Sequence, residues 1–558
     1  MAILPHILLL SLFILTPIAT DQNDERPLVT TKYGKLRGVT VPVKETSRVI
    51  DVFYGVPFAK PPVGPLRFAN PEPAEPWSSV RDASKYAPMC LQFELVRIKS
   101  ITGYHSSLVM PPISEDCLYM NVYTPADRHK KSKLPVMLYI HGGAMVIGTA
   151  STYDGSALSA YEKVVVVSIQ YRLGIPGFFS TGDKQFPGNY GFRDQVAALQ
   201  WVQENIADFG GDPKSVTVFG ESAGAMCVSA ILLSPLAKGL FHRAIAESGS
   251  VTLPGFIVSN SEELVPSQEL VANISGCDLA SLADCLKKKS EEEFLAITKA
   301  MGVTAFPGSV DGVFLPKPVK QMMANKEGNK VPLLIGINNQ EFGWELPKLF
   351  GITGITEGMT RETMIQKVQD AISDLSPDVI PFVVDEYIGD ITDPLKIRDR
   401  FLDLCGDQKF VIPALEIAKY YRDLGLPVYF YEFQHPPSFL AHGRPSFVKC
   451  DHGDEIFFVF GGAFLRDGAF FAAPATPEEE VLTKKVLKYW TNFARTGKPN
   501  SPDLPTWRQY GTEEHYIEMS LNLKLSSKLK ERKYKFWTET LPDKIQSQKA
   551  SGGDRTEL

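Results

Sequence analysis

Residues 216–225 read VTVFGESAGA, and this stretch decides the fold. The β-branched run before Gly220 predicts a strand, and the small residues after Ser222 predict a helix packed closely on a sheet. Between them lies the pattern G-x-S-x-G. A sharp turn from strand to helix holds a serine oxygen out of the backbone and aims it at a base, and the flanking glycines leave room for the turn. A glycine turn with a capping serine is the alternative, but the predicted strand before the pattern and the predicted helix after it favour the sharp turn. Ser222 is therefore the candidate nucleophile.

The composition is that of an ordinary globular protein. The chain has 558 residues, of which 44% are hydrophobic and 22% are charged, and its formal net charge is −6. These values favour neither a disordered nor a fibrous class. The sequence has no cluster of basic residues that could bind along a phosphate backbone, so nucleic acid is not expected as a partner.

Buried strands alternate with amphipathic helices along the chain. Continuous apolar runs at Val136–Ile140 and Val164–Val167 are typical of a parallel sheet that is covered on both faces. Further elements are predicted as strands at Ala244–Ala246, Leu333–Ile337, Val428–Phe433 and Tyr516–Met519, and as helices over 194–208 and from a capping box at Thr476 to Gly497. The fold class is therefore α/β, with a large central, mostly parallel sheet flanked by helices. We expect one catalytic domain over residues 21–545 and a flexible tail over 546–558, because nothing marks a second domain.

The first 20 residues are almost entirely apolar up to Ala19 and are followed by acidic residues. This pattern predicts a signal peptide over residues 1–20, cleaved near Ala19 or Thr20. A membrane anchor is the alternative, but Pro5, His6 and Pro17 interrupt a run that needs about 20 apolar residues to span a bilayer. No later segment is long and apolar enough to serve as a transmembrane anchor.

Seven cysteines in an oxidising compartment predict disulfides, and the odd number leaves at least one thiol outside them. We expect Cys90 to pair with Cys117, since they bracket a surface-like stretch, and Cys277 to pair with Cys285, since they bracket a short one. Cys227 falls in the helix after the candidate nucleophile, where a thiol is most often packed. The sequence leaves open whether Cys405 and Cys450 pair.

A glycine-rich turn, His141–Gly142–Gly143–Ala144, directly follows the predicted strand at Val136–Ile140. Attack on an ester carbonyl places negative charge on its oxygen, and backbone N–H groups in such a turn stabilise that charge. An ordinary strand-end turn is the alternative. We predict that Gly143, Ala144 and Ala223, the residue after the nucleophile, supply the donors of an oxyanion hole.

A histidine must act as the base, and in enzymes with this elbow the acid and then the histidine follow the serine along the chain. His452 lies in a polar, glycine-containing loop, KCDHGDE, which suits an imidazole delivered to the elbow. His435 precedes two prolines and resembles turn structure, and His242 and His515 lie where a surface histidine would serve. His452 is the predicted base.

The acid must lie between the serine and the histidine. Glu341 lies just past the end of the predicted strand Leu333–Ile337, where sheet proteins place functional residues. Asp311 is the competitor, but its V-D-G context is typical of a turn cap. Glu341 is therefore the predicted acid.

The chain resembles a known family, the type-B carboxylesterases among the cholinesterase-like α/β-hydrolases, and within it the vertebrate liver and intestinal carboxylesterases. The resemblance covers nearly the whole mature chain. It rests on the segments FGGDP to GESAG (209–224), EDCLYMNV (115–122), FYGVPFA (53–59), QYR (170–172), QEFGW (340–344) and DHGDE (451–455).

The resemblance implies the same triad, Ser222, Glu341 and His452, the same oxyanion donors and the same two disulfides. It also implies hydrolysis of uncharged carboxylic esters, and of some amides and thioesters, including xenobiotic and lipid esters, through an acyl-enzyme. No metal or organic cofactor is required by this chemistry. One departure is Ala144, where the family often has a third glycine.

Three other functions are alternatives to this one. A cholinesterase holds its quaternary ammonium on an aromatic face, and its subfamily uses a tryptophan in the first cysteine loop, which this chain lacks between Cys90 and Cys117. A non-catalytic adhesion relative usually lacks the serine that is present here. A lipase-like hydrolase of acylglycerols or of cholesteryl or retinyl esters stays open.

Two short motifs bear on location. Asn273 begins the only N-glycosylation sequon, N-I-S. The chain ends in Arg555–Thr556–Glu557–Leu558, which resembles receptor-read retention signals such as K-D-E-L but has threonine in place of aspartate. We therefore expect retention in the endoplasmic reticulum lumen through contact of this tail with a retention receptor, with secretion as the alternative.

Overall fold

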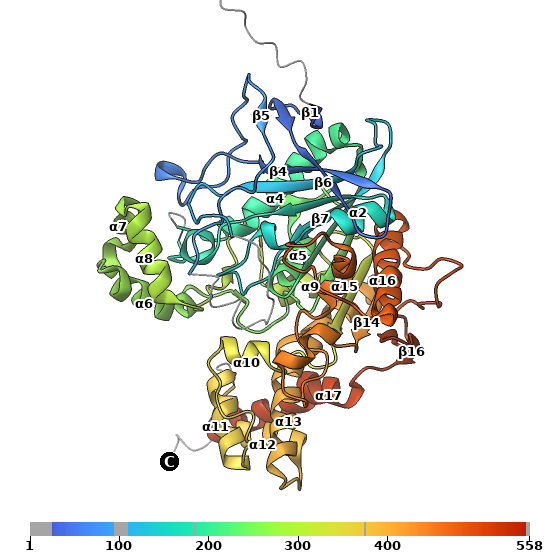
Figure 1. Ribbon diagram of the computed structural model, residues 1–558. Helices are drawn as coiled ribbons and strands as arrows, with labels where there is room; N and C mark the ends of the chain where they lie inside the picture. Colours follow the sequence, from blue (N-terminus) through green and yellow to red (C-terminus); the bar gives the residue numbers. More distant parts are fainter. Residues whose placement is uncertain (1–24, 94–109, 184–185, 373–374, 554–558) are drawn as a thin grey trace, which may run out of the picture.

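A central sheet of eleven strands organises the molecule (Figure 1). The computed structural model describes residues 25–93, 110–183, 186–372 and 375–553. In spatial order the strands are β16 (Lys524–Ser527), β15 (His515–Met519), β14 (Val428–Phe433), β13 (Leu333–Asn338), β10 (Arg243–Glu247), β9 (Gly211–Glu221), β7 (Leu134–Ile140), β8 (Val165–Ile169), β6 (Tyr119–Pro125), β4 (Val49–Pro57) and β3 (Val39–Pro42).

The seven strands from β15 to β8 run parallel, and antiparallel strands flank them at both edges. Each strand that the sequence predicted lies in this parallel part; the predicted bounds of Val428–Phe433 agree with β14, and the other bounds are shifted by a few residues. The predicted fold class, a large and mostly parallel sheet flanked by helices, is confirmed.

Alternate side chains of β7 show why its apolar run is continuous. Val136, Leu138 and Ile140 belong to one apolar cluster, and Met137 and Tyr139 belong to a second cluster on the other face. Because successive side chains of a strand point to opposite faces, a sheet that is buried on both sides needs apolar residues at every position.

Helices cover both of these faces (Figure 1). The first cluster includes side chains of α4, α5 and α14, and the second includes side chains of α2 and α16. Their bounds are α2 (Ser156–Glu162), α4 (Tyr190–Asn205), α5 (Ala223–Leu233), α14 (Ile412–Asp423) and α16 (Pro477–Thr496). Helix α16 begins at the predicted capping box, where Thr476 accepts a hydrogen bond from the Glu479 amide, and it ends at Gly497 with φ 77°.

Two groups of helices lie outside these layers. Helices α6 (Val265–Ser275), α7 (Leu282–Lys288) and α8 (Glu291–Met301) lie at the left of Figure 1. Helices α11 (Arg361–Ala371), α12 (Ile380–Ile388) and α13 (Pro394–Gly406) lie at the bottom and form an apolar cluster of their own. A π-helical turn, Asp407–Val411, joins α13 to α14 and thus connects this group to the central sheet.

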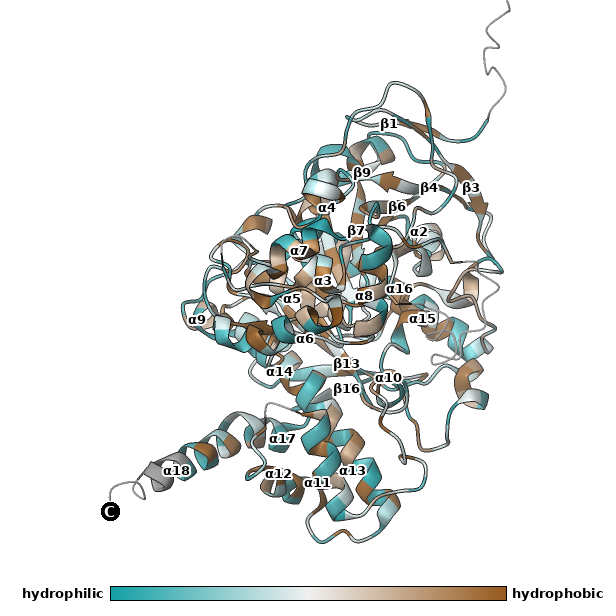
Figure 2. Cartoon of the chain, turned by 90° about the vertical axis from the view of Figure 1, so that its left-hand side faces the viewer, coloured by the Kyte–Doolittle hydropathy of each residue, from teal (hydrophilic) through white to brown (hydrophobic). Residues whose placement is uncertain are grey.

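Helix α18 (Leu541–Gly553) spans residue 546, where the predicted flexible tail begins. Its sequence, LPDKIQSQKASGG, is rich in residues that tolerate a helix, and glycines come only at its end. Figure 2 shows α18 extending away from the body of the molecule.

The cysteines divide into two disulfides and three thiols. The structure pairs Cys90 with Cys117, at an S–S distance of 2.00 Å, and Cys277 with Cys285, at 2.02 Å. Cys405 and Cys450 do not form a disulfide with each other; both are buried thiols, as is Cys227.

Within the described residues no helix has the length and apolar character needed to cross a membrane. The predicted signal peptide, residues 1–20, and the last four residues, 555–558, lie outside the described residues.

Candidate active site

Ser222 occupies the sharp turn between β9 and α5, with φ 57° and ψ −126°. Its amide donates to the carbonyl of Glu247 at 2.8 Å, which fixes the turn against the neighbouring strand. The positions on either side must be glycine, because no side chain would fit there. A Cβ atom at Gly220 would lie 2.6 Å from the Ile140 carbonyl oxygen, and one at Gly224 would lie 2.0 Å from it. A strained serine between two glycines is the expected geometry of a nucleophile elbow.

The three predicted triad residues form one chain of hydrogen bonds. The Nε2 atom of His452 lies 2.8 Å from the Oγ of Ser222, and its Nδ1 atom lies 2.6 Å from the Oε2 of Glu341. Glu341 is fully buried at its side chain, while the imidazole retains 7% exposure. This is the nucleophile–base–acid arrangement that activates a serine.

Two loops bring Glu341 and His452 together although 111 residues separate them. Gln340, which follows β13, forms an isolated bridge with Asp451, beside the histidine. The Asp451 carboxylate accepts hydrogen bonds from the amides of Gly343, Trp344 and Glu345 at 2.9 to 3.0 Å. The loop that carries Glu341 and the loop that carries His452 are therefore one hydrogen-bonded unit.

Glu221 is a site residue that the sequence reasoning missed. Its Oε1 atom lies 3.2 Å from His452 Nε2, the nitrogen that also faces the serine. Burial lowers the pKa of His452, but the charges of Glu221 and Glu341 and the hydrogen bond to Glu341 outweigh burial and raise it. Burial raises the pKa of Glu221 to about 7. The only available signal was its position inside the G-x-S-x-G pattern.

Two further carboxyl groups lie buried near the triad. Burial raises the pKa of Glu247 to about 8, and its Oε1 atom accepts a hydrogen bond from the Trp490 indole at 2.8 Å. Burial also raises the pKa of Glu455, which accepts from the Asn338 side-chain amide at 2.5 Å. Burial therefore shifts both groups toward the protonated, neutral form.

The glycine-rich turn after β7 lines the same cavity as Ser222, and so does Ala223. Gly143 has φ 98°, and a Cβ atom there would lie 2.2 Å from the Ile147 carbonyl oxygen, so only glycine fits. Ala144 and Met145 follow with φ 54° and 59°. Two non-glycine residues in the left-handed region are unusual and are held by their surroundings, which is typical of functional turns.

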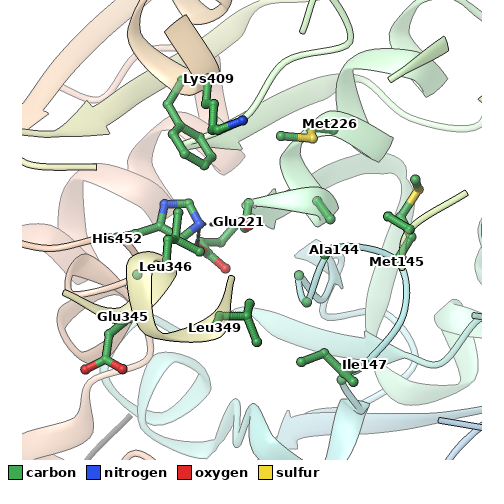
Figure 3. Close-up of a pocket in the computed structure, with 18 of the residues that line it drawn as sticks. Ala144, Met145, Ile147, Glu221, Met226, Glu345, Leu346, Leu349, Lys409 and His452 are labelled. Carbon is green, nitrogen blue, oxygen red and sulfur yellow. Dashed lines mark hydrogen bonds and ion pairs between the residues drawn. The ribbon is translucent and has the colours of Figure 1, made fainter. Parts of the chain in front are cut away.

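A cavity of about 530 Å³ opens over the serine and the turn (Figure 3). Much of its wall is apolar, and in Figure 3 Ala144 and Ile147 lie across from His452. The cavity is also lined by several charged side chains besides the triad: Glu221, Glu345, Lys409, Arg444 and Asp454. An apolar chamber with few polar groups suits a small organic ligand.

The residues that competed for the catalytic roles have other contacts. Asp311 accepts from the amides of residues 313–315 and pairs with Arg193 at 2.7 Å, so it caps a turn. His435 contacts Glu479 at 3.0 Å. His242 accepts from the Val216 amide at 3.2 Å, and His515 lies within β15. None of these residues lines the cavity over Ser222.

Comparison with known proteins gives a consistent answer. Residues 25–537 match the model of the carboxylesterase family. The chain is 49% identical to a medium-chain fatty acyl-CoA hydrolase precursor of Anas platyrhynchos, with 97% of both chains covered. It is 46% identical to an acylcarnitine hydrolase of Mus musculus and 47% identical to a cocaine esterase of Homo sapiens, with 96% of this chain and 95% of each relative covered.

Proposed function

The chain belongs to the carboxylesterase family and is a carboxylic ester hydrolase, and we propose that Ser222, His452 and Glu341 carry out its reaction. The observation that carries the proposal is the unbroken hydrogen-bonded chain from Ser222 through His452 to Glu341, in which Ser222 and His452 line a largely apolar cavity. We assign the oxyanion hole to the backbone N–H groups of Gly143, Ala144 and Ala223.

The reaction proceeds in two halves. Ser222 Oγ attacks the ester carbonyl while His452 Nε2 takes its proton, and the oxyanion is held by the backbone donors. His452 then gives the proton to the leaving alcohol, and an acyl-enzyme remains. Water repeats the sequence and releases the acid. Glu341 holds the imidazole by its Nδ1–H and stabilises the imidazolium.

The substrates that we propose are uncharged esters, with thioesters and some amides, of both xenobiotic and lipid origin. The relatives are named for fatty acyl-CoA, acylcarnitine and cocaine, which differ widely in their leaving groups. The cavity volume of about 530 Å³ is consistent with this breadth.

A panel of esters that varies the acyl and the alcohol side independently tests this substrate class. Hydrolysis of neutral aryl and alkyl esters, at higher kcat/KM than the matched choline esters, supports the proposal. A preference confined to long-chain acylglycerols or to cholesteryl or retinyl esters would replace it by the lipase-like alternative. Turnover of none of these esters would favour a non-catalytic adhesion role.

Activity should fall on acidification, because His452 acts as a base only while it is neutral. The neighbouring carboxylates raise its pKa, so the acid limb of kcat/KM should lie above pH ~6.5, the value of an unperturbed imidazole. Glu221→Gln removes one of these charges, and the limb should move down by about one pH unit or more. The measurement is the pH profile of kcat/KM on a neutral aryl ester.

The matched control is Glu518→Gln, because Glu518 lies in β15, outside the cavity lining. This variant should keep the wild-type profile. A wild-type efficiency that stays flat down to about pH 4, well below the free imidazole value, would contradict a histidine base. An unmoved limb in Glu221→Gln would contradict the electrostatic role of Glu221.

We also propose a luminal location. Residues 1–20 would be removed as a signal peptide, and residues 555–558 would bind a retention receptor. Asn273 is exposed on α6, which suits glycosylation in the secretory pathway. Helix α18 leads away from the body of the molecule (Figure 2).

Deleting Arg555–Leu558 should release the enzyme into the medium, because the receptor reads the terminal tetrapeptide. The measurement is the ratio of secreted to intracellular esterase in cells that express each form. The matched control is Arg555→Lys/Thr556→Asp, which creates a K-D-E-L ending and should be retained. Equal secretion of the intact and truncated chains would show that the natural tail retains nothing.

A further inference from the structure

The turn that carries the proposed oxyanion donors has an unusual backbone shape. Ala144 and Met145 both have positive φ angles, 54° and 59°, and Figure 3 shows both residues across the cavity from His452. Residues with a Cβ atom adopt this conformation at a cost in free energy, so they keep it only where the surrounding structure holds them. The contacts that hold the turn therefore help to set the geometry of the oxyanion hole.

The hydrogen bonds inside the turn leave its two proposed donors available. The amides of Val146 and Ile147 both donate to the Gly143 carbonyl at 3.0 Å. The amides of Gly143 and Ala144, by contrast, donate to no backbone carbonyl in the described part of the chain. Because both residues line the cavity, their N–H groups can face an oxyanion there.

Gly148 closes the turn against its beginning. Its φ is 120°, and a Cβ atom there would lie 2.4 Å from the Nδ1 atom of His141 and 2.7 Å from the Gly142 carbonyl oxygen. In such close packing a displacement of one residue is transmitted to its neighbours. A shift of Gly148 would therefore move Gly142, which directly precedes the donor Gly143.

The side chain of Gln92 holds Gly148 at both of its backbone polar groups. The Gly148 amide donates to Gln92 Oε1 at 3.0 Å, and Gln92 Nε2 donates to the Gly148 carbonyl at 2.9 Å. Gln92 is fully buried, and its Nε2 also donates to the Cys90 carbonyl at 3.1 Å. The amide group thus uses its acceptor and both of its donor hydrogens, which fixes its orientation.

A second glutamine ties the next residue of the chain to the same disulfide. The Oε1 atom of Gln170 accepts from the Thr149 hydroxyl at 3.0 Å, and its Nε2 donates to the Cys117 carbonyl at 3.2 Å. Cys117 is bonded to Cys90, the residue whose carbonyl accepts from Gln92. The end of the turn is therefore anchored to one covalently cross-linked segment, a rigid base for a functional site.

We propose that Gln92 is a positioning residue for the oxyanion hole. Through Gly148 its amide holds the turn in the shape that directs the amides of Gly143 and Ala144 at the developing oxyanion. The inference rests on the proposed function, in which these donors form the hole. Gln92 does not line the cavity, so its loss should weaken stabilisation of the transition state and leave binding of the substrate nearly unchanged.

Gln92→Met tests the proposal, because it removes the amide and keeps an unbranched side chain of similar length. On a neutral aryl ester kcat should fall by about 10²-fold, the effect of losing or misplacing an oxyanion donor. KM should hardly change. The kcat is measured per active site, counted by titration with a fluorophosphonate, so that unfolded chains do not contribute.

A transition-state analogue gives a readout that a merely structural role would not move. Ser222 Oγ adds to the carbonyl carbon of a trifluoromethyl ketone, its proton passes to His452, and the former carbonyl oxygen becomes an oxyanion in the hole. The corresponding methyl ketone is too weakly electrophilic to form this adduct. In Gln92→Met, the inhibition constant of the trifluoromethyl ketone divided by that of the methyl ketone should rise by about 10²-fold, in parallel with the fall in kcat.

Gln203→Met is the matched control. Gln203 Nε2 also joins two backbone carbonyls, those of Pro213 and Leu240 at 2.8 Å each, but these belong to β9 and to the segment before β10. This variant should keep the wild-type kcat and inhibition ratio. Gln92→Glu is a second test: burial favours the protonated acid, which keeps one acceptor and one donor, so its losses should be intermediate.

An unchanged kcat in Gln92→Met would overturn the proposal, and so would a lower kcat with an unchanged inhibition ratio or an equal loss in Gln203→Met. If neither Gln92 variant gave enzyme that reacts with the fluorophosphonate, Gln92 would be a folding residue and the proposal would also fail. None of these results affects Ser222. The proposed function itself fails only if Ser222→Ala keeps turnover of the same ester.

Discussion

Ser222→Ala is expected to lower kcat on a simple aryl ester by about 10⁶-fold, the value typical of a serine that acts within a triad. The serine Oγ lies 2.8 Å from His452 Nε2, and alanine removes that atom while keeping the Cβ that the strained turn already accommodates. Substrate binding and the oxyanion donors remain, so a small residual rate over water is expected. Steady-state and single-turnover kinetics measure the loss.

The chain offers a matched control in Ser248→Ala. Ser248 is buried, has φ 55° and follows the neighbouring strand β10, but it does not line the cavity. Activity of this variant should stay within about tenfold of wild type, as for most substitutions outside the reacting groups. If Ser222→Ala kept a tenth of the wild-type turnover, Ser222 would not be the nucleophile.

Glu341→Gln is expected to lower kcat by about 10⁴-fold, as for the acid of other serine triads, where the isosteric amide favours the wrong histidine tautomer. Glu341 accepts from His452 Nδ1 at 2.6 Å and from the Asn338 amide at 2.6 Å. The amide keeps the shape but removes the charge that stabilises the imidazolium. The kcat on a neutral ester, with thermal unfolding as a check of folding, measures the effect.

Glu455→Gln is the matched control for this substitution. Glu455 is buried and also contacts Asn338, but burial favours its neutral form, so the amide replaces a group of similar charge. We expect its activity to stay within about tenfold of wild type, because the substitution hardly changes the charge at this position. Comparable activities of the two folded variants would contradict the role of Glu341.

Much of the site could be predicted because its chemistry is local in the sequence. The elbow is encoded by consecutive residues, since Gly220 and Gly224 each approach the Ile140 carbonyl too closely for a side chain. Glu341 was found from its place after a buried strand, and the structure sets it beside His452 through the bridge between Gln340 and Asp451. That bridge joins distant loops and has no pattern in the sequence.

Other features depend on packing that no periodicity encodes. Lys409 and Phe410 face the cavity because a π turn changes the register between α13 and α14, and a helical pattern shows no such turn. The contact of Glu221 with His452 joins residues that are far apart in the sequence, so it is visible only in the folded chain. At the C-terminus, α18 continues to Gly553, because polar residues such as Lys and Gln are also good helix formers.

The most direct test of the central claim is to label the enzyme with a fluorophosphonate and to locate the adduct by peptide mass spectrometry. The account predicts one adduct per chain, on Ser222, because only this hydroxyl among the described residues contacts the His452 imidazole. Labelling should be lost in Ser222→Ala and slowed in Glu341→Gln. An adduct on any other residue, or undiminished labelling of Ser222→Ala, would contradict the proposed mechanism.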